Sequence, residues 1–278
     1  MTDRISGKTI IITGAGSGFG ALASRRLAAR GGKLVCCDID AESARMTVDA
    51  IIGEGGEAIA ATADVSSLDA MRAVAALAVD TFGSTDVLVN NAGIMPLAFL
   101  ADHVSAAEAW ARCIDINFKG VVNGTCAVHD QMIAQGHGQI VNMSSIFGNV
   151  PVMGGSVYGA TKAAVDYFSH SVRQESRGKI KVTVIKPTGV NATNLGNSVV
   201  NGAAAIGALG ANYTEYRAML GEMVEGTAPG ELSDPESIAY ASLAPEYIVD
   251  AIVHAIDQPW GVSVSDITVR ASGDHYVM

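Results

Sequence analysis

Residues 9–20 read Thr9-Ile-Ile-Ile-Thr13 and then Gly14-Ala-Gly-Ser-Gly-Phe-Gly20, and this stretch decides the fold class. The apolar run predicts a buried β-strand, the glycines predict a tight turn, and a helical pattern follows over residues 21–29. Such a turn lets backbone N–H groups approach a pyrophosphate at the helix N-terminus, where the helix dipole favours negative charge. A glycine-rich run alone also fits a structural loop, but the flanking strand and helix favour dinucleotide binding. The predicted cofactor contacts here are Gly14, Ser17, Gly18, Phe19 and Gly20.

The rest of the chain repeats this alternation of short apolar runs and helical stretches. It predicts further strands over residues 33–37, 57–63, 86–90, 139–143, 180–185 and 267–270, and helices over residues 41–52, 66–83, 105–112, 117–135 and 157–177. The helix that starts near residue 66 opens on Ser66-x-x-Asp69, a capping-box pattern. We therefore expect an α/β fold: a doubly wound, Rossmann-type parallel sheet with helices on both faces. Ligands of such sheets bind beyond the carboxyl ends of the strands, where the motifs below fall.

The composition excludes several classes of function. Hydrophobic residues make up 49% of the chain and charged residues 17%, and no linker or repeat divides residues 1–278, so we expect a single domain with a large core. The net charge of −10 argues against binding nucleic acid or an anionic membrane surface. The sequence has no signal peptide pattern and no membrane-spanning apolar run, so we expect a cytoplasmic protein. Its four cysteines and six histidines lack metal-ligand spacing, and no metal site is predicted.

Tyr158 and Lys162 are spaced i and i+4 on a predicted helix, which places them one turn apart on the same face. A lysine ammonium beside a tyrosine hydroxyl favours the phenolate and lowers the tyrosine pKa, which suits a general acid/base. Alone, this spacing also fits a tyrosine ring that packs along a lysine stem. Ser145, at the end of a predicted strand, is the candidate to hold a substrate oxygen, whereas Ser144 points to the opposite face.

Asp38 ends the second predicted strand, where a carboxylate accepts hydrogen bonds from ribose hydroxyls and repels a 2′-phosphate. No basic residue adjoins it, so the sequence favours NAD over NADP. Asp64 and Val65 follow the third strand and either contact the adenine or form a turn. Asn90-Asn-Ala-Gly93 closes the fourth strand, with Asn90 as much a brace of the sheet as a ligand. The predicted cofactor contacts here are Asp38, Asp64, Val65, Asn91, Ala92 and Gly93.

Taken together, these motifs resemble the short-chain dehydrogenase/reductase family, in the branch of about 250 residues. The match spans Lys8 to about Thr193 and rests on the T-G-x-x-x-G-x-G turn, N-N-A-G and Y-x-x-x-K. The resemblance implies a catalytic tetrad of Asn117, Ser145, Tyr158 and Lys162, with Tyr158 as the proton donor and acceptor. It also implies that Lys162 binds the nicotinamide ribose and lowers the Tyr158 pKa, that Asn117 anchors a water, and that helices 117–135 and 157–177 pair in a homotetramer. From the residues alone, Asn117 inside a helix either disturbs the backbone or has no special role.

The sequence departs from the family pattern after the sixth strand. The family has Pro-Gly there, followed by a threonine near the nicotinamide carboxamide, whereas this chain reads Pro187-Thr-Gly-Val-Asn-Ala-Thr193. Thr188 stands where the glycine is expected, and the threonine arrives one residue late, so the backbone geometry is expected to differ. The cofactor contacts that the resemblance implies here are Pro187, Gly189, Val190 and Thr193.

Substrate choice is expected to depend on apolar residues and on a long segment after the sixth strand. The pocket residues predicted are Met95, Ile146, Phe147, Val152 and Met153, and residues 191–232 are predicted to form a lid. The lid is rich in apolar residues with Arg217 as its one basic residue, which predicts a low-polarity secondary alcohol or ketone as substrate. Alternatively, these apolar residues cover a core or a subunit contact.

We therefore expect an NAD-dependent alcohol dehydrogenase or ketone reductase. The alternatives are a reductase that prefers NADPH, which Asp38 opposes, and a catalytically silent dinucleotide-binding regulator, which should have lost some of the tetrad. The tail, Gly273-Asp-His-Tyr-Val-Met278, either reaches a neighbouring subunit or is frayed.

Overall fold

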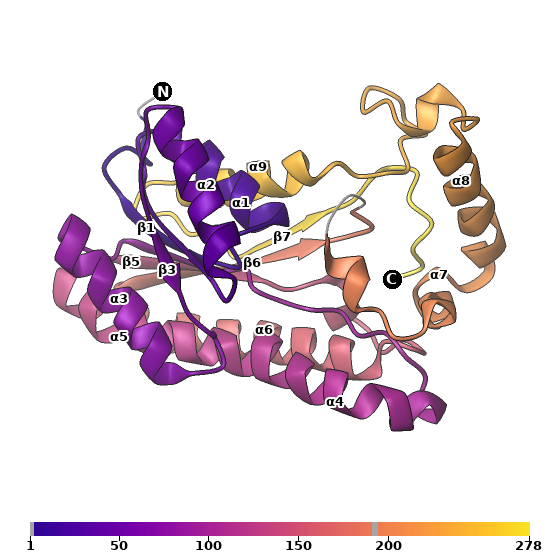
Figure 1. The fold of residues 1–278 in the computed structure, drawn as a ribbon, viewed down its shortest axis with the longest axis horizontal. Helices are drawn as coiled ribbons and strands as arrows, with labels where there is room; N and C mark the ends of the chain where they lie inside the picture. Colours follow the sequence, from indigo (N-terminus) through magenta and orange to yellow (C-terminus); the bar gives the residue numbers. More distant parts are fainter. Residues whose placement is uncertain (1–2, 191–193) are drawn as a thin grey trace.

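The computed structural model describes residues 3–190 and 194–278. Its strands form one parallel sheet of seven strands in the order β3-β2-β1-β4-β5-β6-β7 (Figure 1). The chain starts at β1 in the middle, builds outward to β3, and then crosses back to β4 and builds the other half. The reversal opens a crevice between β1 and β4, the place where such sheets bind ligands. The predicted fold class is confirmed.

All seven predicted strands are present, with ends that differ from the expected ones by two residues or fewer. They are β1 Thr9–Thr13, β2 Lys33–Asp38, β3 Glu57–Thr62, β4 Val87–Asn90, β5 Gly138–Met143, β6 Ile180–Pro187 and β7 Asp266–Val269. Each inner strand pairs in parallel with both neighbours, so the carboxyl ends of the strands meet at one edge of the sheet.

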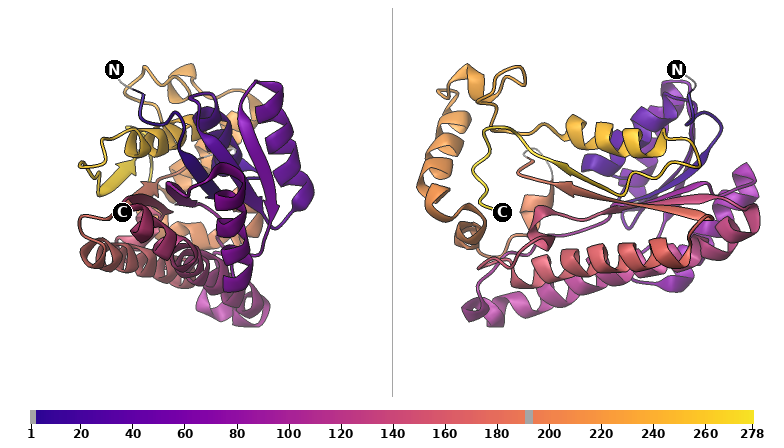
Figure 2. Two further views of the ribbon diagram at one scale, coloured as in Figure 1. Left: turned by 90° about the vertical axis from the view of Figure 1, so that its left-hand side faces the viewer. Right: turned by 180° about the vertical axis from the view of Figure 1, so that it is seen from behind.

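Helices cover both faces of the sheet. The α-helices of the described residues are α1 Gly18–Ala28, α2 Ala41–Gly53, α3 Leu68–Phe82, α4 His103–Ile114, α5 Gly120–Gln135, α6 Ser156–Glu175, α7 Ile206–Leu209, α8 Tyr213–Glu225 and α9 Pro245–Ile256. Helices α1, α2 and α9 lie on one face, and α3, α5 and α6 on the other, as the two further views in Figure 2 also show. In the part of the chain that the structure describes, no helix is both long and apolar enough to cross a membrane.

The start of α3 corrects one prediction. Its N-cap is Ser67, whose side chain accepts a hydrogen bond from the Ala70 N–H, and not Ser66. The backbone N–H of Ser66 instead donates to the Asp64 carboxylate at 2.8 Å. The aspartate turn moves the helix start one residue along the chain.

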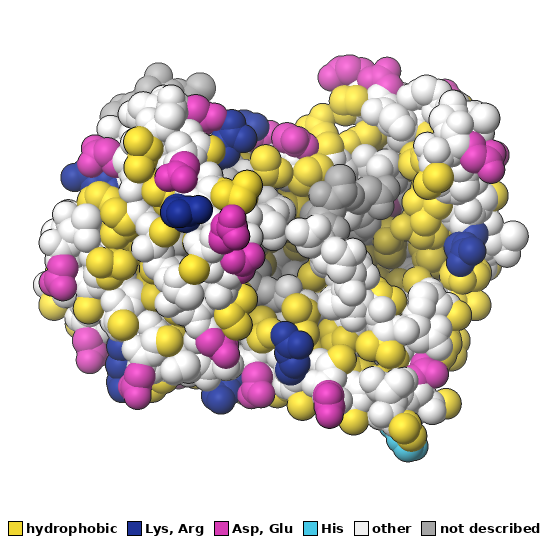
Figure 3. Space-filling view, viewed as in Figure 1, with side chains coloured by type: hydrophobic (Ala, Val, Ile, Leu, Met, Phe, Trp, Pro, Cys, Tyr) yellow, Lys and Arg dark blue, Asp and Glu magenta, His cyan; other side chains and the backbone are white. Residues whose placement is uncertain are grey.

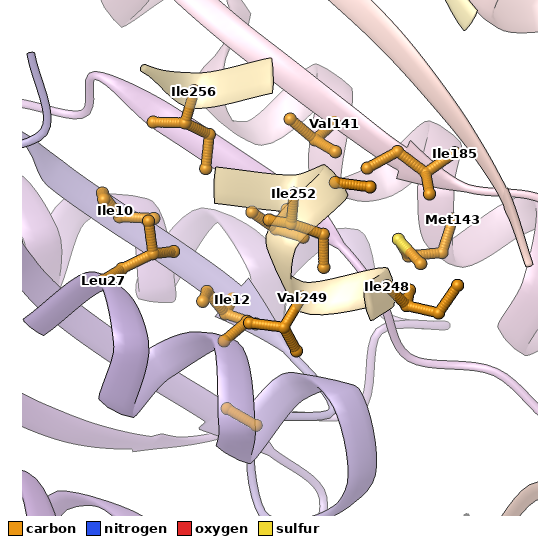
Figure 4. Close-up of a cluster of buried hydrophobic side chains, with 14 of the residues drawn as sticks. Ile10, Ile12, Leu27, Val141, Met143, Ile185, Ile248, Val249, Ile252 and Ile256 are labelled. Carbon is orange, nitrogen blue, oxygen red and sulfur yellow. The ribbon is translucent and has the colours of Figure 1, made fainter. Parts of the chain in front are cut away.

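The core explains why the sheet is rigid. Alternate residues of a strand face opposite sides, so Ile10 and Ile12 pack with α1 and α9, while Ile11 packs with α3 and α5. Figure 4 shows Ile248 and Ile252 of α9 pointing into the first of these clusters. Burying a side chain of this size stabilises the fold by about 1.5–3 kcal/mol. A sheet packed on both faces holds the loops at its carboxyl edge in fixed positions.

The segment after β6 leaves the sheet and forms the described part of the predicted lid. It consists of short helical turns at 194–198 and 202–205, α7, α8 and a further turn at 230–232. Helix α8 stands beyond the carboxyl ends of the strands, away from the sheet (Figures 1 and 2). Figure 3 shows the surface hollowed between the body of the protein and this helix. The lid is therefore a separate helical wall that faces the edge of the sheet.

Candidate active site

A cleft of about 940 Å³ lies at the carboxyl edge of the sheet. The residues that line it follow six of the strands, from β3 at one side to β6 towards the other, and include residues of the lid. The predicted site residues found in the lining are Gly14, Ser17, Gly18, Phe19, Asp38, Asp64, Val65, Asn91, Ala92, Gly93, Met95, Ser145, Ile146, Phe147, Tyr158, Lys162, Pro187, Gly189 and Val190. Strand ends far apart in the sequence thus supply one continuous surface.

The glycine turn forms the floor of the cleft beneath the start of α1. Gly14 has a φ of +65°, and a Cβ there would lie 3.0 Å from the Cα of Ala92. Gly18, with a φ of +51°, has no described atom within 4 Å of its Cβ position, so this side of the turn is open. No side chain caps α1, which leaves its first N–H groups free to bind an anion. The turn therefore fits a pyrophosphate.

Gly20 has a different role from the other predicted contacts of the turn. It is outside the lining, and a Cβ at this position would lie 2.1 Å from the carbonyl oxygen of Gly14. Only glycine lets the helix pack this closely on the turn.

Asp38 forms the wall of the cleft at the end of β2. One carboxylate oxygen accepts the Gly16 N–H at 2.8 Å, and the other accepts the Asp40 N–H at 3.0 Å. A carboxylate has about four acceptor sites, so these two bonds orient Asp38 and still leave capacity for ribose hydroxyls. Ile39 beside it is exposed. Among the described residues that line the cleft, Lys162 and Arg112 carry the positive charge, and neither adjoins Asp38 in the sequence.

The asparagines after β4 connect strands to one another. Asn90 donates to the side chain of Asn142 on β5 at 2.8 Å and is buried, which confirms its bracing role. Asn91 lines the cleft and donates to the backbone carbonyl of Thr13 at 2.9 Å. This bond joins the end of β4 to the glycine turn and holds these two parts of the cleft in a fixed position relative to each other.

Asp64 forms the predicted turn and also lines the cleft, so its contact with the adenine stays a prediction. Its carboxylate forms the turn before α3 through Ser66, and its side chain also lines the cleft. Val65 packs against Gly120, where a Cβ would lie 2.8 Å from its side chain, and its carbonyl accepts Asn123 at 2.9 Å. These contacts fix the third strand end against α5.

Tyr158, Ser145 and Lys162 meet at the end of β5, within the first two turns of α6. The Phe147 N–H donates to the Ser145 hydroxyl at 3.3 Å, and the Ser145 side chain lies close enough to Tyr158 to favour its phenolate. The Lys162 ammonium donates to the Met143 carbonyl at 2.8 Å. Ser144 turns away from the cleft chemistry, as expected, and its hydroxyl donates to the Lys162 carbonyl at 3.2 Å. One strand end and one helix face therefore hold a phenol, a hydroxyl and an ammonium together.

Burial is the main cause of the pKa shifts of Tyr158 and Lys162. It raises the pKa of Tyr158 to about 12, although the nearby Ser145 side chain favours the phenolate. It also lowers the pKa of Lys162 to about 8. The expected lowering of the Tyr158 pKa by Lys162 is not found, because the ammonium is held by Met143 and lies 5.7 Å from the centre of the tyrosine ring. The free phenol is thus a proton donor at neutral pH.

Asn117 lies behind the cleft, not in its lining, and is completely buried. The helix forms a π-helical turn at Asp115–Lys119, and Asn117 lies at the middle of this turn. Its side chain accepts the Ile94 N–H at 2.9 Å and donates to the Ile94 carbonyl at 2.8 Å. A Cβ on the neighbouring Gly93 would lie 3.3 Å from the Asn117 oxygen and 3.7 Å from the Lys162 nitrogen. Asn117 therefore holds the loop after β4 against the lysine.

The departure from the family pattern after β6 changes the local backbone. Gly189 takes the left-handed conformation, with a φ of +54°, one residue later than the Pro-Gly pattern would place it. Thr188 is buried, and its hydroxyl has no hydrogen-bond partner among the described residues. Pro187, Gly189 and Val190 still line the cleft. Thr193 lies outside the described residues.

Two predicted pocket residues do not line the cleft. Met153 is 63% exposed, and Val152 packs at the edge of the apolar cluster that contains Tyr158. Their loop supports the lid instead, because the Gly154 carbonyl accepts the Ala98 N–H and Gly154 packs closely on Ala204. The sequence placed this loop near the site without showing which side of it faces the substrate.

Sequence reasoning also missed residues that the structure adds to the cleft. The lid supplies Tyr216, the tail supplies Tyr276, and α4 supplies Arg112. Ser198 anchors the lid, because its hydroxyl accepts the Met95 N–H at 2.7 Å. The further lining residues that were not predicted are Ile39, Ala63, Ile94, Pro96, Ala109, Ile116, Met143, Ser144, Asn194, Leu195, Gly196 and Asn197. An aromatic residue in a tail of mixed composition is the only signal that the sequence offered for Tyr276.

The fold and the site together define a class: a doubly wound α/β protein with a phosphate-binding turn and a buried proton donor at the same edge of its sheet. A family model described as short chain dehydrogenase matches residues 8–203. The chain belongs to the short-chain dehydrogenase family, a family of oxidoreductases.

Relatives with similar sequences carry oxidoreductase names. The chain is 34% identical to the uncharacterized oxidoreductase Lmo0432 of Listeria monocytogenes, over 95% of this chain and 96% of that protein. It is 35% identical to 2,5-dichloro-2,5-cyclohexadiene-1,4-diol dehydrogenase LinX of Sphingobium indicum, over 69% of this chain and 76% of that one. A solved structure of a metagenomic short-chain oxidoreductase in complex with NADP has a TM-score of 0.72 and 26% identity, covering 96% of this chain and 98% of the other.

Proposed function

We propose that this protein is an NAD-dependent oxidoreductase that interconverts a secondary alcohol and a ketone of low overall polarity. One observation carries the proposal: a buried phenol, Tyr158, next to Ser145 and one helical turn from Lys162, shares a cleft with the glycine turn and Asp38. A proton donor and a dinucleotide cradle in one cavity are the parts that this chemistry needs.

The residues of the chain divide the work of the reaction. A nicotinamide ring bound in the cleft supplies the hydride chemistry. The Ser145 hydroxyl holds the substrate oxygen, and Tyr158 gives that oxygen a proton during reduction or removes one during oxidation. The Lys162 ammonium, positioned by its bond to the Met143 carbonyl, binds the nicotinamide ribose. Asn117 keeps the loop above Lys162 in place through Ile94.

The proposed preference for NAD over NADP rests on Asp38. Its carboxylate, held by two backbone N–H groups, would repel a 2′-phosphate. A reductase that prefers NADPH is the second candidate, because a structural neighbour contains NADP and a 35% identical relative from Shigella flexneri is named an NADP-dependent 3-hydroxy acid dehydrogenase. The charge of Asp38 favours NAD over this alternative. A silent regulator is disfavoured because all four tetrad residues are retained.

The proposed low polarity of the substrate rests on the residues that line the cleft near Tyr158. Met95, Ile146 and Phe147 line this side of the cleft, and the Phe147 ring packs edge-on against Tyr158 with centres 5.3 Å apart. The LinX relative is named for a chlorinated cyclic diol, which is compatible with such walls. A homotetramer, implied by the family resemblance, is part of the same proposal and is checked by analytical ultracentrifugation.

The absorbance of reduced nicotinamide tests the proposal directly. Purified protein is mixed with a panel of secondary alcohols, with NAD and NADP in parallel, and the reverse reaction is measured with ketones. We expect turnover with NAD and with apolar alcohols ahead of acidic or polyhydroxylated ones. A preference for NADP would overturn the cofactor assignment, and failure to bind either reduced dinucleotide would overturn the function.

A further inference from the structure

The tail after β7 is folded back into the active-site cleft of its own chain. Arg270, the residue after β7, makes a two-pronged ion pair with Asp274, with N–O distances of 2.7 and 3.0 Å. The same guanidinium donates to the backbone carbonyls of Tyr276 and Met278. The Asp274 carboxylate also accepts the Tyr276 N–H at 3.1 Å. Arg270 and Asp274 thus form a clamp that sets the path of residues 274–278.

The lid holds the same tail from the other side. The Val277 N–H donates to the Ala208 carbonyl at 3.0 Å, and the Asn212 side chain donates to the His275 carbonyl at 3.0 Å. The Tyr216 ring of α8 packs edge-on against Tyr276, with centres 6.0 Å apart. The tail is therefore neither frayed nor free to reach a neighbouring subunit in this conformation. It forms the contact between the lid and the body.

This arrangement places the Tyr276 side chain in the substrate region of the cleft. Its ring lies over Gly189, where a Cβ would be 2.4 Å from the ring. The same ring packs against the apolar cluster that contains Tyr158, Ile146 and Phe147. Tyr276 and Tyr216 both line the cleft. Two phenols thus face a region whose walls are otherwise mainly apolar.

The chemistry of this pair suits an uncharged oxygen. Burial raises the pKa of Tyr276 above its usual range, so its phenol stays neutral at physiological pH. The Tyr276 hydroxyl has one proton to donate and an oxygen that accepts, so it can pair with an alcohol or a carbonyl oxygen. The acidic lining residues Asp38 and Asp64 lie at the β2 and β3 side of the cleft, away from Gly189 at the end of β6. A buried hydroxyl in an apolar wall discriminates strongly for a ligand that can pair with it.

We propose that Tyr276, supported by Tyr216, determines substrate specificity by hydrogen-bonding a second, uncharged oxygen of the substrate. The preferred substrate is then a diol or hydroxyketone with an apolar frame. Arg270 and Asp274 are positioning residues that act through the tail. This inference rests on the proposed function, since it concerns the other end of the same substrate.

The test compares cyclohexanol with the 1,2-, 1,3- and 1,4-cyclohexanediols, which differ from it by one oxygen. For wild type, kcat/KM should be higher for at least one diol than for cyclohexanol. Tyr276→Phe, which removes only the hydroxyl, should lower this diol-to-cyclohexanol ratio by about tenfold, the value of one good neutral hydrogen bond. The matched control is Tyr167→Phe, the same change at a side chain on α6 that is 79% exposed, and it should leave the ratio unchanged.

A second variant separates positioning from contact. Asp274→Asn keeps the size of the side chain and weakens the clamp, so the ratio should fall in the same direction but by less than in Tyr276→Phe. A ratio that stays the same in Tyr276→Phe, or that falls equally in Tyr167→Phe, overturns the inference.

Binding measured by saturation-transfer NMR on the dinucleotide-loaded protein keeps the two proposals apart. A protein that binds a diol better than cyclohexanol, with the preference lost in Tyr276→Phe, supports the inference even if no alcohol is turned over. If wild type and Tyr276→Phe oxidise these alcohols with the same diol-to-cyclohexanol ratio, the proposed function is retained and the inference is overturned. Equal binding of diol and cyclohexanol to wild type also overturns it.

Discussion

Among single residues, Tyr158 carries the chemical step in the proposed reaction. Tyr158→Phe removes the hydroxyl and keeps the ring that packs against Phe147. We expect the variant to bind NADH like wild type and to lose at least about a hundredfold in kcat, the usual contribution of a general acid/base. Fluorescence titration measures the binding, and Tyr167→Phe on the same helix serves as the control. Turnover above a tenth of the wild-type value would contradict this role.

The raised pKa of Tyr158 and the lowered pKa of Lys162 make a prediction about pH. Because burial places the Tyr158 pKa at about 12, the acid form required for ketone reduction dominates at neutral pH. Oxidation needs the base form, whose fraction rises with pH, so kcat/KM for an alcohol should increase by up to about tenfold per pH unit above pH 7. Reduction should change little between pH 6 and 7, where Lys162, with a pKa of about 8, keeps its proton. The apparent pKa values in these profiles belong to the pair.

The rates of oxidation and reduction are measured against pH with saturating dinucleotide. These profiles show whether oxidation becomes faster as the pH increases. The residual activity of Tyr158→Phe should lack the alkaline rise. An oxidation rate that falls as pH increases from 7 to 9, with the protein still folded, would contradict the assignment.

In the proposed reaction, Asp38 sets the preference for NAD over NADP. Replacing Asp38 with Ala and Ile39 with Arg removes the repelling carboxylate and adds a partner for a 2′-phosphate. The ratio of kcat/KM for NAD to that for NADP should fall by at least about tenfold. Asp40→Ala is the matched control, because Asp40 caps α2 and is outside the lining, so it should affect stability and not the ratio. An unchanged ratio in the double variant would mean that Asp38 does not meet the ribose.

Among the elements, replacing glycine with alanine should have opposite effects on stability in α1 and α2. Gly20→Ala places a methyl group 2.1 Å from the Gly14 carbonyl, so α1 must move off the turn. We expect a loss of about 2 kcal/mol or more in the free energy of unfolding and weaker NADH binding. Gly53→Ala, at the last residue of α2, has no described atom within 4 Å and should be neutral or stabilising by up to about 1 kcal/mol.

Urea denaturation and NADH titration of the two variants measure these effects. Equal stability of Gly20→Ala and wild type would show that the turn can relax and that the close approach of α1 is not required.

For the whole molecule, the layer formed by α1 and α9 joins the beginning and the end of the chain. Arg26 of α1 pairs with Asp250 of α9 at 2.9 Å, and Ile252 is completely buried between α9 and the sheet (Figure 4). Ile252→Ala should cost about 2–5 kcal/mol in the free energy of unfolding, because it leaves a cavity in the shared core. His254→Ala, at an exposed position of the same helix, should change the stability by about 0.5 kcal/mol or less.

Circular dichroism and NADH binding followed through the same thermal unfolding check whether this core is cooperative. Coincident loss of both signals is expected for Ile252→Ala, since the sheet and the cleft share the core. A cleft that unfolds well before the sheet would contradict this coupling.

Local patterns in the sequence determined the fold class and most of the dinucleotide side of the cleft. The strand, turn and helix of residues 9–28, the carboxylate of Asp38 at a strand end, and the i, i+4 spacing of Tyr158 and Lys162 all depend on neighbours within a few residues. Such spacings translate directly into position, because a strand ends where its apolar run ends and a helix repeats every 3.6 residues. The alternation of strands and helices then places all these motifs at one edge of the sheet.

Only the tertiary structure decided the substrate side. Tyr216 and Tyr276 are far apart in the sequence, and their contact with each other and with Gly189 depends on how the lid and the tail pack on the sheet. The Asn117 side chain bonds to the backbone of Ile94, 23 residues earlier in the chain, and Val152 and Met153 do not line the cleft. The Tyr158 pKa likewise follows from burial among distant segments, not from the nearby lysine. Packing between remote segments has no period in the sequence, so these features become defined only when the chain is folded.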